Sequence, residues 1–330
     1  VDDPVLEGFV DLAEAFSILD LRDVDEALEC FARARDRFAS VGHVRGEAQA
    51  LKGLGHALFE GHRLGEAMDA VDASLALFED LGSIKGLAYG QELVGEILLD
   101  LGCADRAVIA LEAARAGWAR TGLATGTTRV AMGRAMDGIG DPVEAEKLYT
   151  AGLQEMALAQ PSELRLTLFH WGRFLVRQGR GIEAELVAED LVARNAASDV
   201  PHLVAAANAL LARALLLQGN IEEAERRVDE VLPVIAEAPL EQLQPLDALL
   251  DCIEVLRAAG RDDGADEALA VAVRTMKDMG RAIADPALRR TFLTDVRACR
   301  RLRQLGRTDV VGGQTVLGGP SISQPMTPTA

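Results

Sequence analysis

The sequence predicts an all-α protein in which about seven helical hairpins stack into an α-α superhelix. Small residues return at a near-constant period along most of the chain. Hydrophobic residues make up 49% of the 330 residues but aromatic residues only 4%, so alanine and leucine, both strong helix formers, supply most of the apolar surface. No segment shows the alternation of β-branched or aromatic residues with polar ones that indicates a strand.

The repeat is marked first by an alanine that follows a short acidic turn. Successive copies lie 38 to 41 residues apart. Such a period is typical of a repeat array, in which each unit buries its apolar face on its neighbours. The seven positions are Ala27, Ala67, Ala107, Ala145, Ala184, Ala224 and Ala265.

A second small residue lies twelve positions before each alanine, except in the seventh repeat, where Ile253 stands. We expect this residue on the first helix of each hairpin to let the second helix approach, with the alanine as the opposing contact, because a longer side chain would force the pair apart. The six small residues are Ala15, Gly55, Gly95, Gly133, Gly172 and Ala212.

The turns between paired helices carry signals of their own. Asp141 and Asn220 stand where they can cap the following helix. A glycine just before this position supplies the left-handed conformation that ends the first helix. These glycines are Gly102, Gly140, Gly179, Gly219 and Gly260.

These positions together resemble the tetratricopeptide repeat, over roughly residues 5–280. The resemblance is clearest in the segments 101–107 and 218–224. The repeat period is longer than the usual repeat length of about 34 residues. Longer repeats of this kind look similar to the sensor regions of large bacterial signalling ATPases and to peptide-binding scaffold proteins. The resemblance implies a regulatory arm of a larger signalling protein, which couples ligand binding to an attached ATPase, kinase or DNA-binding module. The segment 285–293 resembles the end of such arrays.

We expect the solenoid to span residues 1–306 and to end in a capping helix at about 285–305. This helix carries six arginines, which we expect to pair with the acidic body rather than to bind nucleic acid. Residues 307–330 are rich in Gly, Pro, Ser and Thr, which predicts a flexible tail or linker. The arginines are Arg289, Arg290, Arg297, Arg300, Arg301 and Arg303.

Charge and hydropathy exclude several classes of partner. The net charge of −18 repels phosphate backbones and anionic membranes, so we expect neither nucleic acid nor membrane as a partner of this region. No run of about 18 apolar residues could span a bilayer. The chain opens at Val1 without a secretory signal, and we expect it to be a cytoplasmic piece of a longer or processed protein. The four cysteines are widely spaced, as expected of buried residues in a reducing compartment.

The sequence predicts no catalytic, cofactor or metal site. It contains no phosphate-binding loop, zinc-protease motif or nucleophile elbow. The five histidines never fall four residues apart, and paired carboxylates such as Glu222 and Glu223 precede helix starts, where the helix dipole favours them. An enzyme with its active site in the groove remains the rival function, but no nucleophile, base and orienting group can be placed.

One set of polar residues stands out, on the first helices, which line the concave face of such arrays. Arginine fills the slot after the small residue in repeats four to six, and its planar fork suits carboxylate or phosphate oxygens. We expect this stripe to contact a protein or peptide, or a small effector, that carries an anionic group. The alternative is internal pairing, with Glu92 and Glu96 as partners of Arg134. The candidates are Arg134, Arg173, Arg213, Arg177, His170, His56 and Lys52.

A second candidate surface is apolar. Leu12, Phe16 and Leu19 in the first repeat and Phe59 in the second also map to the groove side. Exposed, they could accept an amphipathic helix, or an element that precedes Val1 could cover them. The remaining alternative function is a structural module that self-associates through an open end of the array.

Overall fold

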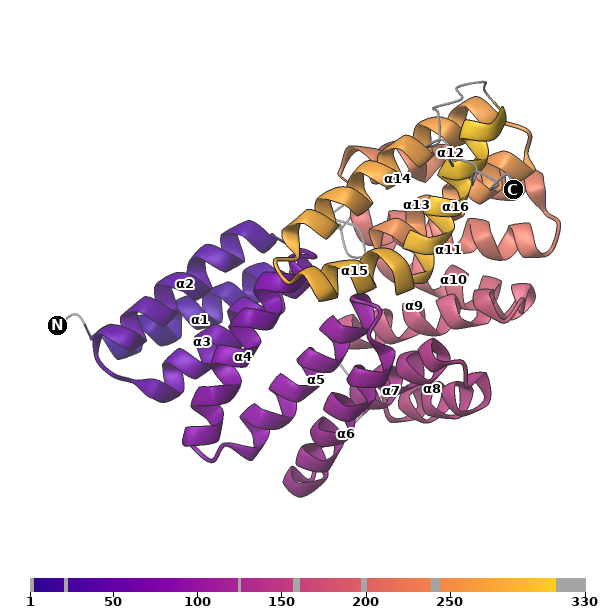
Figure 1. Cartoon of the computed structure of the whole chain (residues 1–330). Helices are drawn as coiled ribbons and strands as arrows, with labels where there is room; N and C mark the ends of the chain where they lie inside the picture. The colour runs from indigo at the N-terminus through magenta and orange to yellow at the C-terminus, as the bar shows by residue number, and fades with distance from the viewer. Residues whose placement is uncertain are drawn as a thin grey trace, which may run out of the picture.

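The computed structural model describes residues 3–20, 23–123, 126–156, 161–196, 201–238 and 244–312. Within these ranges the chain forms sixteen helices and no strand, so the all-α prediction is confirmed. Figure 1 shows the helices stacked side by side along a curved array, with the N-terminus at its narrow end.

Fourteen helices form seven antiparallel hairpins, as the repeats predict, and the first helices of successive hairpins touch one another from α1 to α13. These odd-numbered helices therefore form a continuous inner row. The hairpins are α1 (Pro4–Asp20) with α2 (Val24–Ser40), α3 (Val44–Glu60) with α4 (Leu64–Asp80), α5 (Ile84–Asp100) with α6 (Ala104–Thr121), α7 (Gly126–Ile139) with α8 (Pro142–Met156), α9 (Pro161–Arg177) with α10 (Gly181–Ala196), α11 (Pro201–Leu217) with α12 (Ile221–Glu237), and α13 (Pro245–Ala258) with α14 (Asp262–Ala282).

The small residues lie where the paired helices meet. All seven repeat alanines are completely buried, at 0% exposure. A Cβ atom on Gly133 would lie 3.2 Å from the carbonyl oxygen of Ala145 and 3.1 Å from the ring of Tyr149, one turn further along α8. The opposing surface is thus the backbone of the repeat alanine and the side chain that follows it by one turn. The predicted role of the small residues is confirmed.

The turn glycines also behave as predicted. Each of the five takes a positive φ, between 72° at Gly179 and 93° at Gly140. In the second hairpin the same slot holds His62, which adopts a φ of 56° without being glycine. Asp141 caps α8 by accepting a hydrogen bond from the backbone N–H of Glu144 at 3.0 Å. Asn220 precedes α12 but makes no side-chain capping hydrogen bond, so that expectation is wrong.

The C-terminal segment differs from the single helix expected at about 285–305. It forms two helices, α15 (Pro286–Asp295) and α16 (Arg297–Gly312), so helix continues into the segment that we expected to be tail. Residues 313–330 lie outside the described ranges. The chain bends at Val296, which is extended at φ −63° and ψ 125°. Val296 packs against the turn of the third hairpin, where its nitrogen lies 3.1 Å from the position of a Cβ on Gly102.

The two C-terminal helices do more than cap the last hairpin. They pack on α13 and α14, and the segment also reaches hairpins two to four. Backbone atoms of residues 282–284 lie within 3.2 to 3.4 Å of a Cβ placed on Gly65, and Arg297 hydrogen bonds to Asp137. Figure 1 shows α15 near the centre of the molecule, between the N-terminal and the C-terminal hairpins. The segment therefore spans the concave side of the array.

No helix in the described ranges is both long and apolar enough to cross a bilayer. The four cysteines are all free of disulfide bonds, and Cys30, Cys252 and Cys299 are buried.

Candidate binding site

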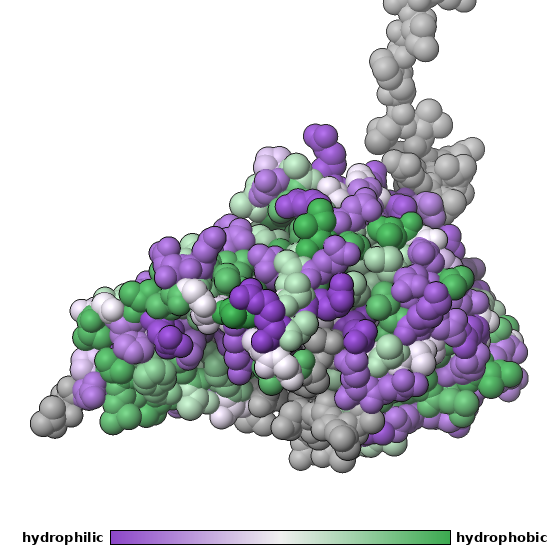
Figure 2. Space-filling model, turned by 90° about the horizontal axis from the view of Figure 1, so that it is seen from below, coloured by the Kyte–Doolittle hydropathy of each residue, from purple (hydrophilic) through white to green (hydrophobic). Residues whose placement is uncertain are grey.

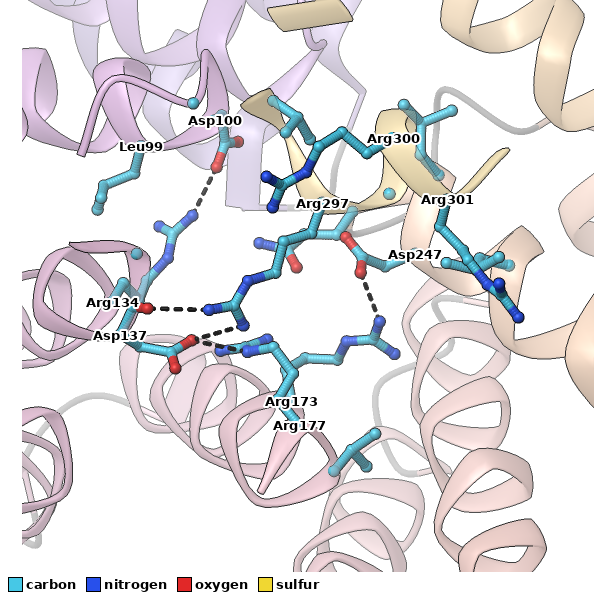
Figure 3. Close-up of a pocket in the computed structure, with 18 of the residues that line it drawn as sticks. Leu99, Asp100, Arg134, Asp137, Arg173, Arg177, Asp247, Arg297, Arg300 and Arg301 are labelled. Carbon is cyan, nitrogen blue, oxygen red and sulfur yellow. Dashed lines mark hydrogen bonds and ion pairs between the residues drawn. The ribbon is translucent and has the colours of Figure 1, made fainter. Parts of the chain in front are cut away.

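A cavity of about 550 Å³ lies between the inner row of helices and the C-terminal pair α15–α16. Its wall draws on α5, α7, α9, α11 and α13 on one side and on α15 and α16 on the other (Figure 3). Seven arginines and six carboxylates line it, although the chain as a whole is strongly acidic. These charged residues are Arg134, Arg173, Arg177, Arg213, Arg297, Arg300 and Arg301, with Asp100, Asp137, Asp247, Asp251, Glu254 and Asp295.

Most of the residues predicted from the sequence come together in this cavity. All four candidate arginines and His170 line it. Lys52 and His56 do not, because they lie on α3, at the other end of the inner row. The repeat period thus places the stripe on one wall.

Arg173 is the most deeply buried of the arginines, at 6% exposure. One guanidinium nitrogen donates to Asp247 at 2.6 Å and the other contacts Asp251, while its Nε has no hydrogen-bond partner. Burial opposes the charge of Arg173, but the two carboxylates outweigh it and raise the pKa of the guanidinium above its ordinary value. Arg173 is therefore a fixed charge within the wall.

Arg134 pairs with a different carboxylate from those expected. Its guanidinium donates to Asp100 at 2.5 Å, whereas Glu92 accepts hydrogen bonds from Trp118 and Thr127. Glu96 is partly buried near Arg134, and burial, helped by the charge of Glu92, raises the pKa of its carboxyl to about 8. The expected partners are wrong because α5 presents Asp100, one turn beyond Glu96, to the guanidinium.

The two remaining candidate arginines are also paired within the molecule. Arg213 donates to Glu254 at 2.8 Å. Arg177 donates to Asp137 at 2.8 Å, and about a quarter of its side chain is exposed (26%). Internal pairing therefore accounts for the whole stripe, and ligand contact by these arginines stays a hypothesis.

His170 does not add a positive charge to the stripe. The residue is 7% exposed and lines the cavity. Burial, followed by the nearby charges of Arg134, Arg177 and Arg173, lowers the pKa of its imidazole well below the ordinary value. The ring is neutral at physiological pH, so it can offer a ligand one donor and one acceptor but no cation.

Sequence reasoning missed the contribution of α16 to the cavity. Arg297 donates to the carboxylate of Asp137 at 3.1 Å and to its backbone oxygen at 2.9 Å, and Arg301 donates to Glu254 at 3.0 Å. Arg300 lines the cavity but forms no ion pair with a described residue, and in Figure 3 no dashed line joins it. The spacing of these arginines, at 297, 300 and 301, does place them on one helix face. It gives no sign of which surface that face meets.

Lys52 and His56 belong to a separate aromatic cluster on the inner face of hairpins two and three. The Lys52 ammonium lies 4.5 Å from the ring centre of Tyr89 and 5.7 Å from that of Phe16. Burial, with a smaller effect of Lys85, lowers the pKa of Lys52. The imidazole of His56 lies 3.2 Å from the Tyr89 hydroxyl.

The apolar surface expected in the first repeat is wrong in part. Leu12 and Leu19 are buried within the hairpin itself, at 5% and 8% exposure, and Phe59 is partly buried. Phe16 is 36% exposed and packs edge-on against Phe31. Nearer its start, α1 exposes three further apolar residues, and Figure 2 shows hydrophobic side chains gathered at this narrow end of the molecule. They are Leu6, Phe9 and Val10, at 63%, 40% and 60% exposure.

Comparison with known proteins identifies the fold. No family model matches the sequence, and no curated protein matches it. Among solved structures, a Rap protein complexed with competence and sporulation factor is similar at 12% identity and a TM-score of 0.68, over 86% of this chain and 78% of that one. NprR in complex with its cognate peptide NprX gives 11% identity and a TM-score of 0.56, over 95% and 99%.

A third similar structure is a signal transduction ATPase with a tetratricopeptide repeat sensor from Pyrococcus horikoshii. It shares 14% identity at a TM-score of 0.50, over 86% of this chain and 44% of that larger one. The chain is a tetratricopeptide-like repeat array. At these identities the similarity concerns the fold alone.

Within the described ranges, no group of three or more His, Cys, Asp or Glu side chains is placed to hold a metal ion.

Proposed function

We propose that this repeat array is a non-catalytic regulatory scaffold that binds a peptide in the cavity beneath α15 and α16. The observation that carries the proposal is the cavity itself, which forms between distant parts of the array and is lined by charged side chains. Its volume of about 550 Å³ lies within the usual range for ligand sites, about 300–1,000 Å³. The peptide and factor complexes of NprR and Rap proteins support the proposal by their shared fold.

The ligand that best fits this lining carries an anionic group. The paired arginines are already neutralised, so a ligand carboxylate finds its free partner in Arg300. Neutral His170 offers one hydrogen-bond donor and one acceptor to the rest of a peptide. Arg173 then acts by holding α9 against α13, not by touching the ligand.

By the same reasoning the array works inside the cell as the sensing arm of a larger signalling protein. Free cysteines fit a reducing compartment, and the acidic surface disfavours nucleic acid as a ligand of the array as a whole. The similarity to a larger signal transduction ATPase that has a tetratricopeptide repeat sensor supports this context.

The test uses a pool of random linear peptides, of about six to ten residues, incubated with the whole chain. We expect the retained peptides, identified by mass spectrometry, to share a carboxylate at one position. Isothermal titration of a retained peptide should then give an affinity that falls about tenfold or more in Arg300→Glu. The matched control is Arg115→Glu, an exposed arginine on the outer helix α6 with the same change of charge. Equal affinity in both variants would exclude the cavity as the binding site.

A second candidate function is self-association through the exposed apolar face of α1. The exposed apolar side chains of Leu6, Phe9 and Val10 favour it, because a contiguous apolar patch is typical of a protein–protein contact surface. Light scattering after size exclusion should then give a mass that rises with concentration and returns to the monomer value in Val10→Glu. A constant monomer mass excludes this function.

A further inference from the structure

A second concavity, of about 690 Å³, lies between α14, α15 and α16, and it shares no lining residue with the charged cavity. Its floor is apolar. Met276 and Leu302 are buried beneath it, and Val273 and Leu293 are partly buried. We name it the C-terminal groove.

The rim of the C-terminal groove is wholly basic. Lys277 on α14, Arg289 and Arg290 on α15, and Arg303 on α16 line it, and no Asp or Glu does so among the residues whose side chains the structure describes. Acidic residues outnumber basic ones in the chain by 52 to 34. The basic rim of the C-terminal groove therefore contrasts with the acidic composition of the chain.

The charges on this rim are not neutralised. Arg289 donates to the backbone oxygen of Ile283 at 2.8 Å, and Arg303 donates to that of Leu293 at 3.2 Å, both of which are uncharged acceptors. Lys277 and Arg290 are exposed and form no ion pair with any residue in the described ranges. Four positive charges therefore surround an apolar floor on three sides.

We propose that the C-terminal groove binds an acidic amphipathic helix of a partner protein. Such a helix would lay an apolar stripe on Met276, Leu293 and Leu302, while carboxylates on its flanks would meet the four cations. Nucleic acid fits less well, because the groove has no aromatic side chain on which a base could stack. The groove is thus a docking surface that is independent of the peptide cavity.

The probe is a fluorescent peptide of about 18 residues, or five helical turns, with leucines along one face and glutamates on the others. We expect fluorescence anisotropy to show saturable binding to the whole chain that weakens as salt is added. A peptide with glutamine in place of glutamate should bind about tenfold more weakly. Equal binding of the two peptides would overturn the proposal, since the rim charges would then contribute nothing.

Variants locate the site. The double change Lys277→Glu with Arg290→Glu alters only exposed side chains, and it should weaken binding of the acidic peptide about tenfold or more. The control Arg115→Glu with Arg120→Glu makes the same change of charge on exposed positions of α6, and it should leave binding within about twofold. Equal loss in both double variants would overturn the proposal, because it would reflect net charge alone.

Two further results would assign the groove to another occupant and reject a partner helix. One is tighter binding of a single-stranded oligonucleotide than of the acidic peptide. The other is a marked gain in peptide affinity when residues 313–330 are removed, because the chain's own C-terminal segment would then compete for the groove. This proposal and the proposed function can fail separately, because Arg300 lines only the charged cavity. Arg300→Glu should weaken binding of the cavity peptide and leave binding of the acidic helical peptide unchanged.

Discussion

Single charged residues in this protein act mainly on one another. Asp137 is 5% exposed and accepts hydrogen bonds from both Arg177 and Arg297, which belong to helices far apart in the sequence. Arg173 is likewise held by Asp247 and Asp251. Removing Arg173 leaves the buried carboxylate of Asp251 without its main partner, which costs about 3–5 kcal/mol of stability. Loss of binding in an Arg173 variant would therefore report unfolding as much as lost contact.

The raised pKa of Glu96 predicts a dependence of stability on pH. The folded protein keeps a proton on this carboxyl up to about pH 8, whereas the unfolded chain loses it near pH 4.5. The folded state thus binds more protons between these values, and the free energy of unfolding falls as the pH rises through that interval. In Glu96→Gln this contribution disappears. Melting temperatures at pH 5 and pH 8.5 should differ by several degrees less in the variant than in the natural protein, and an identical difference would contradict the assignment.

At the scale of the elements, the hairpin is the unit that the sequence specifies. Two helices can approach closely only where the contact holds a small residue, as at Gly133 against Ala145. The same requirement applies in the first six hairpins, so the small residues recur with the repeat. A left-handed residue is needed to end the first helix, which explains the turn glycines. Both signals are local, so the sequence predicted the seven hairpins and their contacts. The seventh hairpin forms without a small residue at this contact, because Ile253 occupies the position and is still fully buried.

Replacing glycine by alanine should change the stability in opposite directions in a turn and within a helix. Gly219 has a φ of 80° and no neighbouring atom within 4 Å of an added Cβ, so Gly219→Ala should cost about 1–2 kcal/mol through the backbone alone. Gly306 lies within helix α16 in equally open space, and Gly306→Ala should stabilise by about 0.5–1 kcal/mol. Urea unfolding followed by circular dichroism measures both. Stabilisation by both alanines would show that the turn does not need a left-handed residue.

At the scale of the whole molecule, the C-terminal segment links hairpins that lie far apart along the array. The repeat predicted an open curved ribbon, but the C-terminal segment returns across its concave side to reach hairpins two to four. The segment thereby covers part of an open inner wall and forms a cavity with it. The expected capping helix is broken at Val296, where the extended backbone packs against Gly102 in the turn of the third hairpin.

The contact between Arg297 and Asp137 predicts how the C-terminal segment responds to mutation. Arg297→Ala removes one half-exposed partner and leaves Asp137 paired with Arg177, so the unfolding free energy should fall by about 1 kcal/mol or less. Asp137→Asn weakens the pairing of both arginines and should cost more. Hydrogen exchange should quicken in α15 in both variants, with α1 and α2 unaffected as the internal control. Unchanged exchange in α15 would show that this contact does not hold the C-terminal pair in place.

The sequence by itself determined the helical class, the number of hairpins, the small residues at their contacts and the side of the array on which the arginine stripe lies. These follow from short-range demands that repeat about every forty residues. Only the tertiary structure decided that the stripe is already paired, that Arg300 lines the same cavity without an ion pair to any described residue, and that α15 and α16 cover the site. Those facts depend on contacts between residues as much as 160 positions apart, such as Arg297 with Asp137, which occur once and leave no period to detect.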